Sequence, residues 1–290
     1  MKFDFTAAEQ FIACMNGQLP LGEVLTHPAY QTVGEHARLF GQEWTEDDVR
    51  HALTGSPSPF YGLKGVRENL ARIQTLLSFI QKNEAAWINV IEYELGLLFP
   101  GEEFQITIYP IIGYDMGIGL NGNVCMNCNI KLYMANPVEF MFYIIHECAH
   151  IIYERYHRIK PLDQVVQPAD WYAYFGLWLQ NEGIAVYAPL RLRREWRYLL
   201  DRDYRVLTTP MELEAHRLSF VQALEKLKMK QPLSREEYMG ICFGEQRLTY
   251  RIGCAIYRKI ENQAGLRGVQ EAFLLDGETF LDKYQYMMKI

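Results

Sequence analysis

The sequence predicts an α+β fold that is mostly helical, with a small mixed sheet. Three observations support this prediction. Apolar residues recur at helical spacing through most of the chain, whereas two segments near its centre alternate in the manner of strands. Hydrophobic residues make up 49% of the 290 residues, which is enough for a sizeable core and argues against intrinsic disorder.

The N-terminal part of the chain, residues 1–98, is predicted to be helical. Residues 6–17 predict a capped helix, because Thr6 stands at their start and Glu9 follows three residues later. Apolar side chains at helical spacing predict two further helices, and a segment rich in glycine, proline and serine predicts a loop before them. The two helices are expected at residues 65–83 and 83–99, and the loop at residues 54–65.

The central part, residues 99–158, is predicted to hold the sheet and one buried helix. Residues 104–111 and 124–134 are rich in β-branched and aromatic residues, which predicts a strand in each. The glycine-rich residues 113–123 between them are predicted to form a loop or an irregular edge. Asn136, with a proline at the next position, predicts the start of the buried helix.

The C-terminal part, residues 159–290, is predicted to be a helical subdomain. A linker leads into a strongly apolar helix at residues 169–190. Further helices are predicted at residues 210–230 and 234–265, each followed by a short loop. The basic run at residues 191–197 is interpreted as a solvated helix face rather than as a site for acidic substrates.

Charge and hydropathy exclude several classes of function. The net charge of −6 gives no electrostatic footprint for nucleic acid. No apolar run is long enough to span a bilayer, and the N-terminus lacks the basic and apolar segments of a secretory signal. We therefore expect a cytoplasmic protein whose partners include neither nucleic acid nor a membrane.

The cysteines are expected to be reduced thiols rather than a disulfide framework. Cys125 and Cys128 form a lone CxxC pair, which in other settings binds a metal or carries redox chemistry. No second CxxC and no matching histidine pair accompanies it. We interpret the two cysteines as strand residues, since positions three apart in a strand point to opposite faces.

The residues that carry chemistry are His146, Glu147 and His150, which form an HExxH motif in the buried helix. Residues four apart in a helix lie on one face, so the two imidazoles can bind one tetrahedral zinc ion. Glu147 is placed to reach a water molecule on that ion. The flanking residues are apolar, and polar groups on so apolar a helix need partners, which a hydrated zinc ion supplies.

A catalytic zinc ion takes three protein ligands, so one more is expected from another segment. His157 lies two helical turns beyond His150, too far to share an ion, and Asp163 lies in the linker. Glu182 is the favoured third ligand, because a carboxylate among Trp178, Leu179, Ala185 and Val186 is costly unless it is paired. Asp170 is its main rival, although at a helix start a capping role is the simpler explanation.

HECAH followed by NEGIAVY on the next apolar helix resembles the gluzincin metallopeptidases, which pair HExxH with a glutamate on a following helix. The chain is most similar to uncharacterised families of predicted zinc-dependent proteases that carry a downstream EG-x-A motif. These families also have a strand before the metal helix and a later helix with a tyrosine and a glycine, matched here by Tyr250 and Gly253. The resemblance covers residues 104–265 and implies a zincin-like metallopeptidase fold.

The resemblance implies a peptidase in which His146, His150 and Glu182 bind Zn²⁺ and Glu147 acts as general base toward a zinc-activated water. It also implies that Tyr250 stabilises the oxyanion, with Arg251 and His216 as alternatives. Two departures from the family are visible. The interval from His150 to Glu182 is longer than in the best-known gluzincins, and no exopeptidase glutamate motif precedes the metal helix.

We expect the substrate to be a peptide or protein, bound as an added strand along residues 124–131. Two other interpretations remain. The chain could be a non-catalytic binding or regulatory module on a zincin scaffold, which a fourth protein ligand and a closed site would favour. It could also hydrolyse another amide or an ester by the same chemistry. The sequence predicts neither the cleavage specificity nor the oligomeric state.

Overall fold

The computed structural model of the chain describes residues 1–55, 60–165, 167–229 and 233–288. The chain divides into two compact units. Unit 1 comprises Met1–Tyr93 and Gly101–Ile151, and unit 2 comprises Glu94–Pro100 and Ile152–Ile290. The three-part division at residues 98 and 158 stays a prediction.

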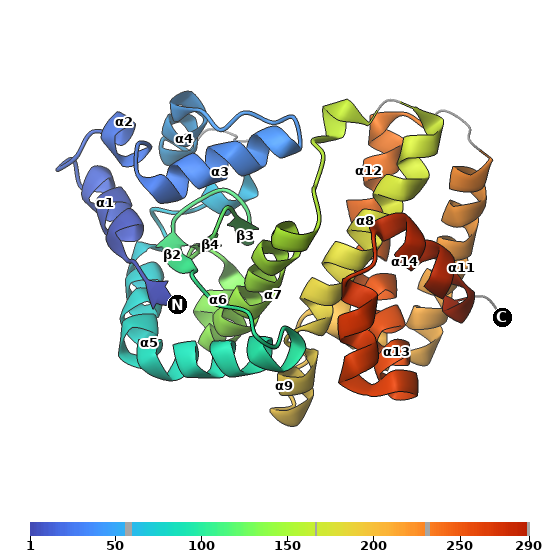
Figure 1. Cartoon of the computed structure of the whole chain (residues 1–290). Helices are drawn as coiled ribbons and strands as arrows, with labels where there is room; N and C mark the ends of the chain where they lie inside the picture. The colour runs from blue at the N-terminus through green and yellow to red at the C-terminus, as the bar shows by residue number, and fades with distance from the viewer. Residues whose placement is uncertain (56–59, 166, 230–232, 289–290) are drawn as a thin grey trace. The chain divides into compact units, whose positions relative to one another are not determined.

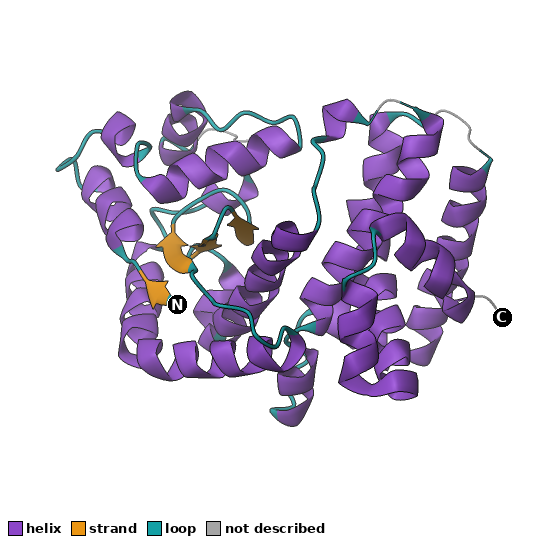
Figure 2. Cartoon of the chain, in the orientation of Figure 1, coloured by secondary structure: helices purple, strands orange, loops and turns teal. Residues whose placement is uncertain are grey.

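Unit 1 contains one small mixed sheet, as the sequence predicts, and the sheet has four strands where the sequence indicated two. The strands lie in the order β1-β2-β4-β3, with β1, β2 and β4 parallel and β3 antiparallel to β4 (Figures 1 and 2). β3 is therefore an edge strand and β4 an interior one. The bounds are β1 Lys2–Phe3, β2 Thr107–Ile111, β3 Gly117–Leu120 and β4 Asn123–Asn127.

The predicted second strand is shorter than expected. It ends at Asn127, and the residues that follow turn into the short helix α6 (Lys131–Ala135). The turn has a local cause, because the Asn127 side-chain oxygen accepts hydrogen bonds from the backbone N–H groups of Asn129, at 2.9 Å, and Gly113, at 3.0 Å. The glycine-rich segment expected to be a loop or irregular edge contains β3, so the edge is a regular strand.

Helices cover this sheet. α1 packs against β2, and α3 packs against β3 and β4 (Figure 1). The predicted cap of α1 is wrong, because Phe5 is the N-cap and the Thr6 hydroxyl donates to Asp4 instead. The bounds are α1 Thr6–Met15, α2 Leu21–Val24, α3 Pro28–Leu39 and α4 Glu46–Leu53, with a 3-10 turn at Tyr61–Leu63.

The two helices expected on either side of Asn83 form one continuous helix, α5 (Leu70–Leu98). Asn83 does not cap a new helix, because its side-chain amide donates back to the Phe79 carbonyl, 2.8 Å away. No proline interrupts the segment, so nothing in the chain ends the helix there. The helix that carries the HExxH motif, α7 (Pro137–Tyr156), begins with proline after Asn136 as predicted.

Every secondary-structure element in the described residues of unit 2 is helical, as the sequence predicts (Figure 2), but the single helix expected at residues 234–265 is interrupted at residues 244–247 and is therefore two helices. α8 (Pro168–Tyr187) is its central helix and packs against α11, α12, α13 and α14. The remaining bounds are α9 Leu190–Glu195, α10 Arg202–Thr208, α11 Pro210–Lys228, α12 Arg235–Phe243, α13 Leu248–Phe273 and α14 Gly277–Tyr284.

Glycines let α8 approach its neighbours closely. A Cβ atom at Gly253 of α13 would lie 2.2 Å from the Leu179 carbonyl oxygen of α8, and one at Gly183 would lie 2.7 Å from the Gly253 backbone. Both separations are too short for any side chain, so this crossing requires glycine on both helices. The crossing fixes the neighbourhood of Glu182.

None of the described helices is both long and apolar enough to cross a lipid bilayer.

Candidate metal centre

α7 presents the HExxH residues from its middle, where the flanking residues are apolar and buried. Ile144, Ile145, Cys148 and Ala149 have no exposed surface, and they fix the helix in the core of unit 1. His146 is 7% exposed and Glu147 6% exposed, while His150 is half-buried. Burial of this degree predicts that the polar groups have partners.

The two histidines point their Nε2 atoms at each other. These atoms are 3.1 Å apart, and the ring planes are inclined by 82°. A tetrahedral zinc ion with Zn–N bonds of the usual length holds two imidazole nitrogens about 3.3 Å apart. The sequence predicts that the histidines share a helix face, and the structure brings the same nitrogen of each ring to the separation that a shared ion needs.

Glu182 completes a group that could hold a metal ion. His146, His150 and Glu182 each offer one ligand atom, and these atoms all lie within 4.8 Å of one another. Within the described ranges, no other set of three or more histidine, cysteine or acidic residues has this arrangement. Two imidazoles and a carboxylate are a ligand set found in catalytic zinc sites.

The rival ligands have other roles. Asp170 is exposed and accepts a hydrogen bond from the Gln167 backbone N–H at 3.1 Å, so it forms part of a capping box at the start of α8. This confirms the capping interpretation. His157 lies 2.8 Å from the Phe273 carbonyl and stacks on Tyr153. The side chain of Asp163 lies outside the described residues.

The β3 strand runs directly over Glu147. A Cβ atom at Gly119 would lie 2.2 Å from the Glu147 carbonyl oxygen, and one at Gly117 would lie 3.1 Å from its Oε1. Position 119 must be glycine because the obstacle there is backbone, whereas at position 117 the nearest atoms belong to the Met126 and Glu147 side chains, so glycine is preferred there rather than required. The sequence analysis missed this contact, although the spacing of two residues, which places both glycines on one strand face, is a signal that could have indicated it.

Tyr250 lies on α13, one helical turn before Gly253 and the close crossing with α8. Its ring packs under the guanidinium of Arg247, which binds Asp203 at 2.9 Å. The two alternatives to Tyr250 bind each other, because Arg251 Nη1 lies 2.7 Å from His216 Nε2. Arg251 is 1% exposed and also binds Asp203 at 2.8 Å. These contacts give Arg251 and His216 a structural role.

The CxxC cysteines lie beside the sheet. Cys125 is a residue of β4 and Cys128 follows the strand, and both are fully buried free thiols. Burial, together with the negative charge of Glu147, raises the pKa of the Cys125 thiol, and burial raises that of Cys128. Both thiols are therefore protonated at neutral pH, which suits buried structural cysteines.

The basic run after α8 is only partly a solvated face. Arg191 and Arg194 are exposed as predicted. Arg193 is fully buried, and its guanidinium lies 4.0 Å from the centre of the Tyr204 ring. This residue is an interior cation held against an aromatic face.

Comparison of the chain with protein-family models, with curated proteins and with solved structures gives no match in any of the three.

Proposed function

We propose that this chain is a zinc-dependent hydrolase of zincin-like type, and that it cleaves peptide bonds. One observation carries the proposal. His146 and His150 present paired nitrogens in a group with Glu182, and a glutamate that is not in that group, Glu147, lies next to His146 in the same helix. This combination of three ligands and one adjacent carboxylate fits a catalytic metal site better than a structural one.

Each residue has a distinct proposed role. His146, His150 and Glu182 hold the ion, which when bound supplies Lewis acidity and lowers the pKa of a coordinated water. Glu147 accepts a proton through its carboxylate and later donates it to the leaving amine. Burial of Glu147 limits competing hydrogen bonds from bulk water.

The β3 strand supports a peptide as substrate. It is an edge strand, so one of its sides is unpaired within the sheet, and it passes over the Glu147 backbone. An extended peptide can add to such an edge through main-chain hydrogen bonds. The earlier expectation for residues 124–131 is wrong in this respect, because β4 pairs on both sides, with β2 and with β3.

We further propose Tyr250 as a donor to the oxyanion that forms during hydrolysis. Its support is the placement of Tyr250 one turn from Gly253, whose backbone touches α8 at Gly183, the neighbour of Glu182. Arg251 and His216 are less suitable, because their contacts are with each other and with Asp203.

Metal content and hydrolysis test the proposal together. The purified protein is expected to contain one zinc ion per chain, and His146→Ala and His150→Ala are each expected to lose it. Glu147→Gln is expected to keep zinc and to lose hydrolysis of a mixed peptide library. Glu154→Gln, a change of the same kind on the same helix, is the matched control and is expected to retain both.

Two results would contradict the proposal. Hydrolysis that survives Glu147→Gln would exclude the proposed base. Stoichiometric zinc without hydrolysis of peptides, amides or esters would instead indicate a non-catalytic binding module.

A further inference from the structure

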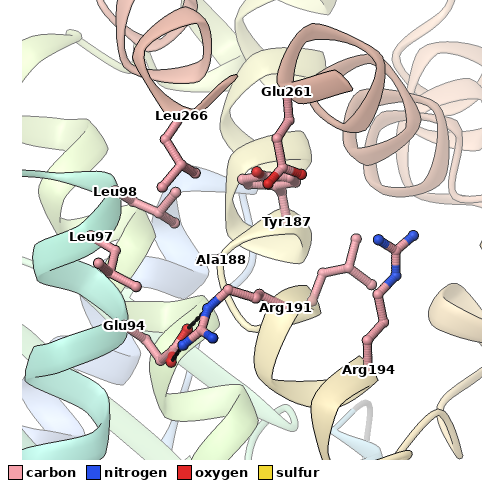
Figure 3. A pocket seen from close by; sticks show the side chains of 10 residues that line it. Glu94, Leu97, Leu98, Tyr187, Ala188, Arg191, Arg194, Glu261 and Leu266 are labelled. Carbon is pink, nitrogen blue, oxygen red and sulfur yellow. Dashed lines mark hydrogen bonds and ion pairs between the residues drawn. The ribbon is translucent and has the colours of Figure 1, made fainter. Parts of the chain in front are cut away.

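A small pocket in unit 2 has no part in the proposed hydrolase centre. It has a volume of about 150 Å³ and is formed by the end of α5, the end of α8, α9 and α13 (Figure 3). An engineered cavity of similar size, about 150 Å³, binds benzene, so the pocket suits a group of roughly six carbon atoms.

One side of the pocket is apolar. Leu97 and Leu98 of α5 contribute to it together with Leu266 of α13 (Figure 3). α13 is kinked just before Leu266, where Gly265 has a φ of 66° and a ψ of −168° that only glycine adopts readily. The helix thus changes direction between Glu261 and Leu266, both of which line the pocket.

The other side is polar, and three of its four charged side chains already have a hydrogen-bond partner within the chain. Arg191 binds Glu94 through two guanidinium nitrogens, and Glu94 is only 3% exposed. Burial raises the pKa of the Tyr187 phenol, and a hydrogen bond to Glu261 raises it further, so this tyrosine stays a neutral donor to that carboxylate. Figure 3 shows both pairs at the wall of the pocket.

Arg194 is the exception among the four charged residues of the lining. Its guanidinium makes no hydrogen bond or ion pair with any residue that the structure describes. Its positive charge nevertheless acts on the Tyr187 hydroxyl, which places it in electrostatic reach of the same wall. A second arginine, Arg258, is in electrostatic reach of Glu261. The charges of the four charged lining residues sum to zero, so what the polar wall offers a ligand is the guanidinium of Arg194, which has no partner among the described residues and lies next to an apolar surface.

We propose that this pocket binds a small aliphatic carboxylate, with the hydrocarbon chain against Leu97, Leu98 and Leu266 and the carboxylate on Arg194. An arginine fork matches a carboxylate in geometry and charge. An aliphatic amine would meet Arg194 as a like charge, and both lining glutamates already have partners. An aliphatic alcohol would fill the apolar side without using the arginine.

Binding of three six-carbon probes tests the proposal: hexanoate, hexylammonium and hexan-1-ol, each titrated into the full-length protein by calorimetry. Hexanoate is expected to bind one to one with a dissociation constant on the order of 1 mM or lower, as its size allows. Hexylammonium is expected not to bind, and hexan-1-ol to bind at least about tenfold more weakly than hexanoate.

Two variants locate the site. Arg194→Gln changes an exposed residue, so the protein should fold, and it is expected to weaken hexanoate at least about tenfold. Arg72→Gln removes an exposed arginine from the first turn of α5 and is expected to leave binding unchanged. Leu266→Trp fills the apolar side and is expected to abolish binding, with thermal unfolding as the check that this variant folds.

Three results would overturn the proposal. They are equal affinity for hexanoate and hexylammonium, unchanged affinity in Arg194→Gln, and no saturable binding of hexanoate. Since none of these measurements uses metal or hydrolysis, they stand whether or not the hydrolase proposal does.

Discussion

The guanidinium carbon of Arg247 lies 3.5 Å from the centre of the Tyr250 ring, and the same guanidinium donates to Asp203. Arg247 has a left-handed backbone, with a φ of 44°, which costs about 1–3 kcal/mol for a residue other than glycine. Asp203 also receives Arg251, so one buried carboxylate holds two arginines and, through one of them, the tyrosine.

Asp203→Asn is therefore expected to destabilise the protein by about 3–5 kcal/mol, because it leaves the buried Arg251 without its counter-charge. The free energy of unfolding in urea measures this loss. Glu271→Gln removes a carboxylate from an exposed pair with Arg267 and is expected to cost less than about 1 kcal/mol. Equal losses of unfolding free energy in the two variants would show that the Asp203 ion pairs stabilise the protein no more than an exposed pair does.

Tyr250→Phe tests the oxyanion role. Loss of one donor is expected to lower kcat about 10²- to 10³-fold and to leave KM nearly unchanged, since the interaction forms only in the transition state. Zinc content should be unaffected. A rise in KM at constant kcat would mean that Tyr250 binds substrate instead.

Gly253→Ala is expected to separate α8 from α13, because its Cβ would lie 2.2 Å from the Leu179 carbonyl. We expect a loss of more than about 2 kcal/mol in unfolding free energy and a weaker affinity for zinc, since Glu182 follows Leu179 on the displaced helix. Gly240→Ala is the control. It lies in α12 with open space around the new methyl group and is expected to stabilise by about 0.4–1 kcal/mol.

His27 is expected to make the stability of α3 depend on pH. Its Nδ1 accepts the Ala29 N–H at 3.1 Å as the N-cap, and its Nε2 lies 2.9 Å from the Thr6 hydroxyl. Burial lowers the pKa of His27 below its usual 6.5, although the charge of Asp4 opposes the shift.

The cap needs neutral Nδ1, so its contribution is present above pH 6.5 and is lost as the pH falls through the lowered pKa. Thermal unfolding between pH 8 and pH 5 measures the loss, which should be about 0.5–2 kcal/mol. His27→Asn keeps a capping side chain that does not titrate and should flatten this part of the profile. The exposed His51→Asn should leave it unchanged.

The sequence predicts the fold best where local chemistry decides it. Pro137 after Asn136 marks the start of α7, and the i, i+4 spacing of His146 and His150 places both rings on one face. The prediction of two separate helices around Asn83 was wrong, because an asparagine side chain can also donate a hydrogen bond to a carbonyl of the preceding turn within one continuous helix. The predicted capping role of Thr6 was wrong for a related reason, because its hydroxyl donates to the Asp4 carboxylate rather than accepting from the first turn of the helix.

The contacts of the site were harder to predict because they join distant segments. Gly117 and Gly119 appear in the sequence only as parts of a glycine-rich stretch, and their meaning depends on β3 meeting Glu147. The ion pair between Asp203 and Arg247 joins residues 44 positions apart in the sequence, and no local sequence pattern indicates it. Glu182 could be proposed as a ligand from the sequence, because a carboxylate without a partner among apolar neighbours is energetically costly.

The two glycines of β3 that lie against Glu147 also limit which substitutions the strand tolerates. A saturation screen at position 119 should return glycine alone, while position 117, where the nearest obstacles are the Met126 and Glu147 side chains, should admit alanine at a penalty. Under the proposed function, Gly117 and Gly119 would offer a peptide at the edge of β3 only backbone groups, while Ile118 and Leu120, which alternate with them, lie on the opposite face of the strand.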